Sequence, residues 1–170
     1  MGVIITIFSI FFAIRLVTLA FSVVNEKRLR KKGAVQYGRL NSVLLTLLHI
    51  TFYFSSLFEA YQTSVDFNVI SAIGLGLMTF GYLVLFVVIY TLRDIWTLKI
   101  YILPNHRLEN GWLFRTFRHP NYFLSIIPEL VGFALLCNAW FTLLFLGHIY
   151  MLVLFVRIRQ EERAMKSIYR

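Results

Sequence analysis

Two polar runs in the carboxyl-terminal third of the chain hold residue types that can do chemistry. The first, Arg118-His119-Pro120-Asn121-Tyr122, precedes an apolar stretch. Proline disfavours helix at the preceding residue and suits the first turn of a new one, so we expect extended geometry at His119 and a helix start near Pro120. A helix start attracts anions, and a guanidinium offers a fork for a carboxylate. The run indicates either an anion-binding corner or an interfacial helix start whose tyrosine and arginine contact lipid headgroups.

The second run, Arg157-Ile158-Arg159-Gln160-Glu161-Glu162, follows the next apolar stretch. On a helix, Arg157 shares a face with Glu161 and Arg159 with Glu162, so ion pairing alone would explain these charges. Two adjacent carboxylates can also accept hydrogen bonds from an ammonium group or a ribose diol. Only a helical hairpin separates the two runs, and antiparallel helices would bring them together.

The elements that position these runs are predicted to be membrane helices. The 170 residues are 59% hydrophobic and 15% charged, which is too apolar for a soluble domain. Because a span needs about 20 apolar residues, we predict a single all-α, polytopic domain over 1–170, with five spans at 3–24, 41–60, 69–92, 121–137 and 139–156. The last two spans form the hairpin, which turns at Cys137-Asn138-Ala139. Small residues at 72, 74, 76 and 81 predict close helix packing in the third span.

The positive charges predict the orientation of the chain. Three segments, 25–40, 93–118 and 157–170, hold six, five and five of the 17 Lys and Arg residues. Five spans place all three segments on one side, which the positive-inside rule makes cytoplasmic. The amino terminus is then outside. The net charge of +9 is therefore attributed to membrane orientation and lipid contact, with no nucleic-acid partner.

The two runs and their spacing resemble the isoprenylcysteine carboxyl methyltransferase family. The likeness rests on Phe117 to Tyr122, the hairpin through Leu136-Cys137-Asn138, and Arg157 with Glu161-Glu162. The run Asn25-Glu26-Lys27-Arg28-Leu29, with Gly33-Ala34 and Tyr37-Gly38, is similar to bacterial members, including ones assigned to alkylpyrone O-methylation.

The resemblance implies an integral-membrane methyltransferase, expected in a bacterial cell membrane, that uses S-adenosylmethionine at the cytosolic face. The acceptor would be lipophilic, either a prenylcysteine carboxylate or an alkylpyrone-like enol. Carried over residue by residue, the candidate catalytic residues are Arg157 and Glu162, and the cofactor pocket is formed by Arg118, His119, Pro120, Tyr122, Glu161 and Glu162. Family members usually have a glycine six residues before the motif arginine and a tyrosine two residues after that glycine. Here Trp112 and Phe114 occupy those positions.

Ionisable residues inside the spans are costly and need their own explanation. We expect Arg15 to pair with Glu129, or both residues to line a substrate-binding tunnel. His49 and His148 are expected to be hydrogen-bonded core residues, since neither has a second ligand at helical spacing, and no metal site is predicted. The family resemblance gives Asn25, Glu26 and Tyr37 an alternative role at the acceptor entrance.

Two other functions remain open at this point. A membrane reductase of the steroid-reductase type would use NADPH at a similar mouth. A small transporter or assembly subunit would use Arg15 and Glu129 as a translocation pair, although the sequence has no inverted repeat of the kind common in transporters. The oligomeric state is not predicted.

Overall fold

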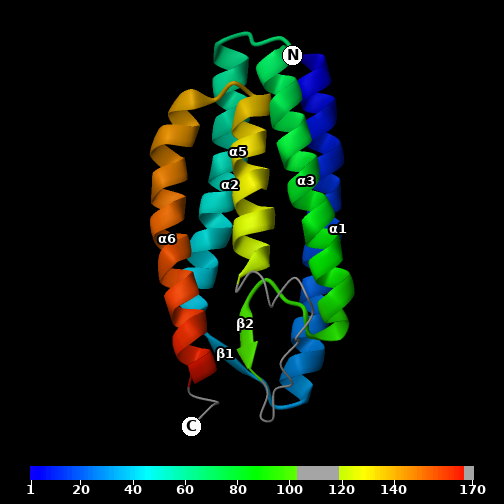
Figure 1. Cartoon of the computed structure of the whole chain (residues 1–170), viewed down its shortest axis with the longest axis vertical. Coiled ribbons are helices and arrows are strands. Elements are labelled where there is room, and N and C mark those ends of the chain that lie inside the picture. Colours follow the sequence, from blue (N-terminus) through cyan, green and yellow to red (C-terminus); the bar gives the residue numbers. More distant parts are fainter. Residues whose placement is uncertain (103–118, 167–170) are drawn as a thin grey trace.

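The computed structural model describes residues 1–102 and 119–166, which form a bundle of long helices with a small strand pair at one end (Figure 1). In chain order the elements are α1 (Gly2–Lys31), β1 (Val35–Tyr37), α2 (Arg39–Gln62), α3 (Val69–Leu92), the 3-10 turn η1 (Arg93–Ile95), β2 (Ile100–Ile102), the π-helical turn η2 (Asn121–Ile126), α5 (Ile127–Leu136) and α6 (Trp140–Lys166).

Within residues 1–102 and 119–166, four helices are long and apolar enough to cross a membrane: Gly2–Lys31, Arg39–Gln62, Val69–Ile95 and Trp140–Met165. A shorter apolar helix, Asn121–Leu136, lies among them. Large apolar side chains such as Val69, Phe141 and Leu152 are at least 70% exposed, as expected where lipid replaces water around a helix bundle. The predicted all-α, polytopic membrane fold is confirmed.

The predicted span boundaries differ from the helices mainly at two ends. The first helix continues from the predicted end at 24 to Lys31, and the last continues from 156 to Lys166, because charged side chains at an interface do not interrupt helical hydrogen bonding. Gly33 ends the first helix at a φ of +84°, where the Ala34 N–H bonds the Leu29 carbonyl at 3.0 Å. The third helix has the predicted bounds.

The strand pair was not predicted. β1 and β2 are antiparallel, with Val35 opposite Ile102 and Tyr37 opposite Ile100. Each strand has three residues, too few for an alternating pattern to be recognised in the sequence. The pair joins the loop after α1 to the chain that follows α3.

The predicted small-residue face of α3 packs against α5. A Cβ added at Gly74 would meet backbone atoms of Gly132, Leu135 and Leu136, and one at Gly81 would meet the Ser125 carbonyl at 2.8 Å. Gly76 has no atom within 4 Å of its Cβ position, so only part of the predicted face is used. This approach fixes α5 in the middle of the bundle, where Figure 1 shows it between α2 and α3.

The predicted hairpin of the last two helices is confirmed. Asn138 has a φ of +50°, and the Ala139 N–H bonds the Ala134 carbonyl at 2.8 Å. η2 has six residues and α5 has ten. Together they extend about 24 Å, which is less than the roughly 30 Å thickness of a hydrocarbon core. The start of this short helix therefore lies inside the ends of α1 and α6, as Figure 1 shows.

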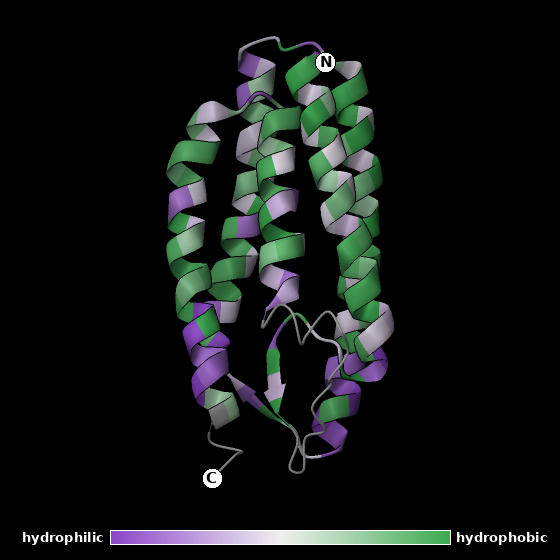
Figure 2. Cartoon of the chain, viewed as in Figure 1, coloured by the Kyte–Doolittle hydropathy of each residue, from purple (hydrophilic) through white to green (hydrophobic). Residues whose placement is uncertain are grey.

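Polar residues gather at one end of the bundle, which we call the charged end. It contains β1, β2, the last turns of α1 and α6, and the start of η2, and Figure 2 shows the hydrophilic residues concentrated there. The amino terminus lies at the opposite end (Figure 1). The three basic segments thus share one end where the structure describes them, and the assignment of that end to the cytoplasm remains a prediction.

Candidate active site at the charged end

The start of the short helix and the last turns of α6 meet at the charged end. His119 lies between two carboxylates of α6, with its Nδ1 3.7 Å from Glu161 Oε1 and its Nε2 3.7 Å from Glu162 Oε1. The pairing with Glu161 raises the pKa of His119, and the charge of Glu162 adds to this effect. Partial burial of the imidazole acts in the opposite direction but is outweighed. The two carboxylates are about one-third exposed, at 32% and 34%, so they are accessible from the aqueous side.

Tyr122 joins this acidic pair to a buried arginine. Its hydroxyl donates to Glu161 Oε2 at 2.6 Å and accepts from Arg157 Nε at 3.3 Å. The π-helical turn that begins at Asn121 sets the direction of Tyr122, and such turns frequently occur at functional sites.

Arg157 is only 2% exposed, and neutral groups accept its hydrogen bonds. One terminal nitrogen donates to Ser42 Oγ at 2.6 Å and the other to the Leu98 carbonyl at 2.8 Å. Among the residues that the structure describes, no carboxylate lies within ion-pair distance of this guanidinium. A buried cation without a direct counter-ion favours the binding of an anionic group nearby.

The structure therefore brings together most of the residues singled out in the sequence. His119, Tyr122, Arg157, Glu161 and Glu162 form one continuous cluster, and the backbone at Pro120 is already helical, with φ −62° and ψ −34°. The predicted pair of Arg159 and Glu162 is present at 3.9 Å.

Two parts of the sequence interpretation have other outcomes. Arg157 reaches Glu161 through the Tyr122 hydroxyl, not through the direct ion pair that helical spacing suggested. Arg118 lies outside the described residues, as do Trp112 and Phe114, so their part in the pocket stays a prediction.

The chain between η1 and β2 crosses the charged end and is held by α1. Asn25 Nδ2 donates to the carbonyls of Arg93 and Trp96, each at 2.9 Å. The Leu98 N–H bonds Ser22 Oγ at 2.9 Å, and Lys99 pairs with Glu26 at 2.7 Å. The polar residues at the end of α1 thus fix the carbonyl that contacts Arg157, and their alternative assignment to the acceptor entrance stays a prediction.

A second polar cluster lies inside the bundle. Arg15 pairs with Glu129 at 3.1 Å, and Glu129 also lies 3.5 Å from His49 Nε2 and accepts a hydrogen bond from Tyr53. Glu129 is fully buried. The predicted Arg15–Glu129 pairing is confirmed, and His49 is a hydrogen-bonded core residue as expected, with Nδ1 3.3 Å from the Tyr150 hydroxyl. A substrate-binding role for Arg15 and Glu129 stays a prediction.

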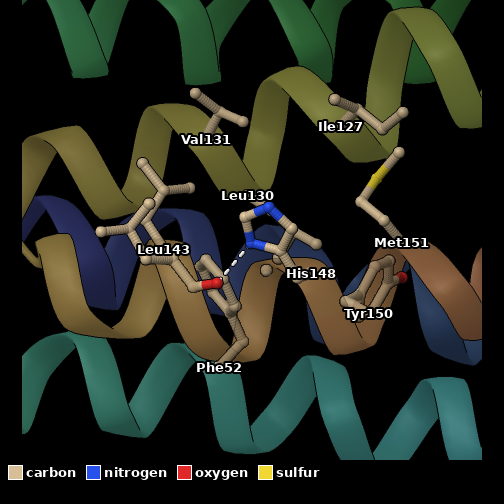
Figure 3. Close-up of a pocket in the computed structure, with 10 residues that line it drawn as sticks. Phe52, Ile127, Leu130, Val131, Leu143, His148, Tyr150 and Met151 are labelled. Atoms are coloured by element: carbon tan, nitrogen blue, oxygen red, sulfur yellow. Dashed lines mark hydrogen bonds between the residues drawn. The ribbon is translucent and has the colours of Figure 1, made fainter.

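An apolar cavity of about 210 Å³ lies between α2, α5 and α6 (Figure 3). Its lining includes Phe52, Leu130 and Leu143, with Ile127 and Met151 toward the charged end. His148, which was expected in the core, is exposed because α6 turns this side chain outward, and it contacts the Leu144 carbonyl of its own helix (Figure 3). The expectation that His148 is a core residue was therefore wrong. Met151 precedes Arg157 by about 9 Å of helix rise, so the cavity lies on the side of Arg157 that is away from the charged end.

Sequence reasoning missed two contacts of Arg157. Ser42 and Leu98 are 115 and 59 residues from Arg157 along the chain, and no local pattern links them to it. The only available signal was the polar pair Asn41-Ser42 at the start of an otherwise apolar span.

Comparison with known proteins gives the family of this chain. The model of the isoprenylcysteine carboxyl methyltransferase (ICMT) family matches residues 72–167, which include both halves of the cluster. An uncharacterized protein of Haemophilus influenzae is 49% identical over 162 residues, covering 95% of this chain and 94% of that protein. The uncharacterized protein YpbQ of Bacillus subtilis is 28% identical over 147 residues, covering 84% of each. No solved structure matches the chain.

The family match and the apolar helices identify an integral membrane protein. Because the matched region exceeds half of the chain, the protein belongs to the isoprenylcysteine carboxyl methyltransferase family, a family of membrane methyltransferases.

Proposed function

We propose that this protein transfers a methyl group from S-adenosylmethionine to an oxygen atom of a lipophilic acceptor at the cytosolic face of the membrane. The observation that carries the proposal is the continuous chain of contacts from His119 through Glu161 and Tyr122 to Arg157. Through the Tyr122 hydroxyl, this chain of contacts joins the accessible carboxylates of Glu161 and Glu162 to the buried guanidinium of Arg157.

The residues at the cluster fit the polar groups of S-adenosylmethionine. Glu161 and Glu162 would accept hydrogen bonds from its ammonium group or ribose hydroxyls. A buried atom two residues from His119, Asn121 Oδ1, has no hydrogen-bond partner among the described residues, and buried polar groups normally have one. The proposed cofactor pocket contains His119, Tyr122, Glu161 and Glu162, with Arg118 added from the family resemblance.

The bound cofactor supplies an activated methyl group on a sulfonium. Methyl transfer to an oxygen that is already anionic needs no general base, so the protein contributes position and electrostatics. Arg157 would orient a carboxylate or enolate oxygen, because its charge is buried and its described partners are neutral. The His119 imidazole, held between the carboxylates, would fix the acidic pair.

The surroundings of the cluster support a lipophilic acceptor. The apolar cavity between α2, α5 and α6 lies on the membrane side of Arg157, and the acidic pair faces the charged end. An acceptor with an apolar tail would approach from the bilayer while the charged cofactor arrives from water. A prenylcysteine carboxylate and an alkylpyrone enol both have this character, and the bacterial relatives favour the second.

Labelled methyl transfer tests the proposal. Purified protein in detergent is incubated with methyl-tritiated S-adenosylmethionine and a bacterial membrane lipid extract, and the product is identified by mass spectrometry. We expect a labelled lipid-soluble product that Arg157→Ala abolishes. Arg163→Ala removes an exposed cation from the same helix and is the matched control, expected to retain activity.

The alternatives give different results. A protein that leaves the lipid extract unlabelled and instead oxidises NADPH in its presence would be a reductase, and the proposal would be wrong. Equal activity of the Arg157→Ala and wild-type proteins would contradict the role of the cluster.

A further inference from the structure

The first turn of α2 contacts α6 at the turn that carries Arg157. Ser42 is 6% exposed. Its hydroxyl donates to the Gly38 carbonyl at 2.9 Å and accepts from an Arg157 terminal nitrogen at 2.6 Å. A hydroxyl has one proton to donate, and the bond to Gly38 uses it, which leaves the oxygen lone pairs directed to the guanidinium.

The neighbouring residue, Asn41, holds the backbone of the same turn. Its Nδ2 donates to the Val153 carbonyl at 3.2 Å and to Gln160 Oε1 at 3.3 Å. Val153 precedes Arg157 by one helical turn and Gln160 follows it by nearly one. Gly38 completes the contact, because it has a φ of +60° and the Gln160 amide occupies the place where a Cβ would be.

These contacts place the Arg157 guanidinium on neutral acceptors. The hydrogen bonds among described residues use three of the five N–H groups of Arg157, one each to Tyr122, Ser42 and Leu98. The other two have no acceptor in the part of the chain that the structure describes. The Glu161 carboxylate lies beyond the Tyr122 hydroxyl and would attract the guanidinium if Ser42 did not accept from it. A guanidinium that turned toward Glu161 would point its two remaining N–H groups in another direction.

We propose that Ser42 is a positioning residue for the methyl transfer, which fixes the Arg157 guanidinium so that its two remaining N–H groups face the anionic oxygen of the acceptor. The inference rests on the proposed function and adds a specific residue from outside the two sequence runs. Small displacements of an orienting group can lower a rate by about 100-fold, so Ser42 would affect the reaction without touching the acceptor.

The test compares Ser42→Ala with Ser42→Thr, which keeps the hydroxyl. Ser56→Ala is the matched control, because Ser56 is a fully buried serine of the same helix whose hydroxyl has no described partner. Two acceptors are used as probes, an S-farnesylated cysteine derivative and an alkyl-substituted hydroxypyrone. The measurements are kcat and KM for each probe, the Kd of S-adenosylhomocysteine, and the thermal midpoint in detergent.

For Ser42→Ala we expect kcat/KM to fall by about 10-fold to 100-fold, while the Kd of S-adenosylhomocysteine stays within threefold of wild type. Ser42→Thr should recover activity to within about threefold, and Ser56→Ala should match wild type. Retained cofactor binding and rescue by threonine separate a positioning role from a structural one.

Two results would overturn the inference alone. One is wild-type kcat/KM in Ser42→Ala when Arg157→Ala is inactive. The other is a parallel loss of activity, cofactor binding and thermal midpoint in Ser42→Ala that threonine does not reverse. A wild-type protein that neither binds S-adenosylhomocysteine nor methylates either probe would instead overturn the proposed function itself, and the inference with it.

Discussion

The close contact of α3 and α5 gives a prediction that two neighbouring glycines test against each other. A Cβ at Gly74 would meet the Gly132 carbonyl at 2.5 Å and the Leu135 carbonyl carbon at 2.8 Å, and would also contact the Leu136 nitrogen. All three atoms belong to backbone, which cannot move aside as a flexible side chain can. Gly74→Ala should therefore separate the helices and lower the free energy of unfolding by about 1–3 kcal/mol.

Gly76 is two residues away on the same helix and has no atom within 4 Å of its Cβ position. Gly76→Ala should raise the free energy of unfolding by about 0.5–1 kcal/mol, because alanine loses less backbone entropy in a helix. Thermal unfolding of both variants in the same detergent is the assay, and the midpoints should differ by roughly 3 °C or more. Equal midpoints for the two variants would refute the close packing of α3 on α5, and with it the placement of the site on the short helix.

Three further predictions concern the charged and buried polar groups. Arg15→Ala leaves the fully buried Glu129 without its cation and should lower the free energy of unfolding by about 3–5 kcal/mol, whereas replacing both residues with methionine should recover most of that loss in denaturation experiments. Because Glu161 raises the pKa of His119, the stability from this pairing is fully present below the unfolded-state pKa of histidine and is lost as the pH rises through the raised value. Thermal midpoints of His119→Gln should therefore lack that pH-dependent step. Glu59 accepts from two backbone N–H groups at the start of α6, both at 2.9 Å, so Glu59→Ala should lower stability by about 1 kcal/mol in thermal unfolding; an unchanged midpoint would show that the cap contributes nothing.

The sequence predicted those parts of the fold that depend on local patterns. α3 has the predicted bounds because Asn68 caps its start, accepting from the Ser71 N–H at 3.0 Å, and a charged segment begins at Arg93. The hairpin was predictable because a polar turn at Asn138 interrupts a long apolar stretch. The contact between the two polar runs followed from that hairpin alone.

The remaining features depend on contacts between distant segments. The strand pair joins residues 63 or more positions apart, and the hydroxyl of Ser42 meets Arg157 across 115 residues. No periodicity in either segment indicates its partner. The continuation of α1 and α6 beyond the spans was missed for another reason, since hydropathy reports where lipid ends and not where helical hydrogen bonding ends.

The central claim is that the acidic pair of α6 binds S-adenosylmethionine. Isothermal titration of S-adenosylhomocysteine into the purified protein tests it most directly, with Glu161→Gln/Glu162→Gln as the variant and Asp66→Asn, an exposed carboxylate outside the charged-end cluster, as the control. We expect binding by the wild-type and Asp66→Asn proteins, and at least tenfold weaker binding by the double variant. Binding of NADPH without S-adenosylhomocysteine, or binding that the double substitution leaves unchanged, would contradict the account.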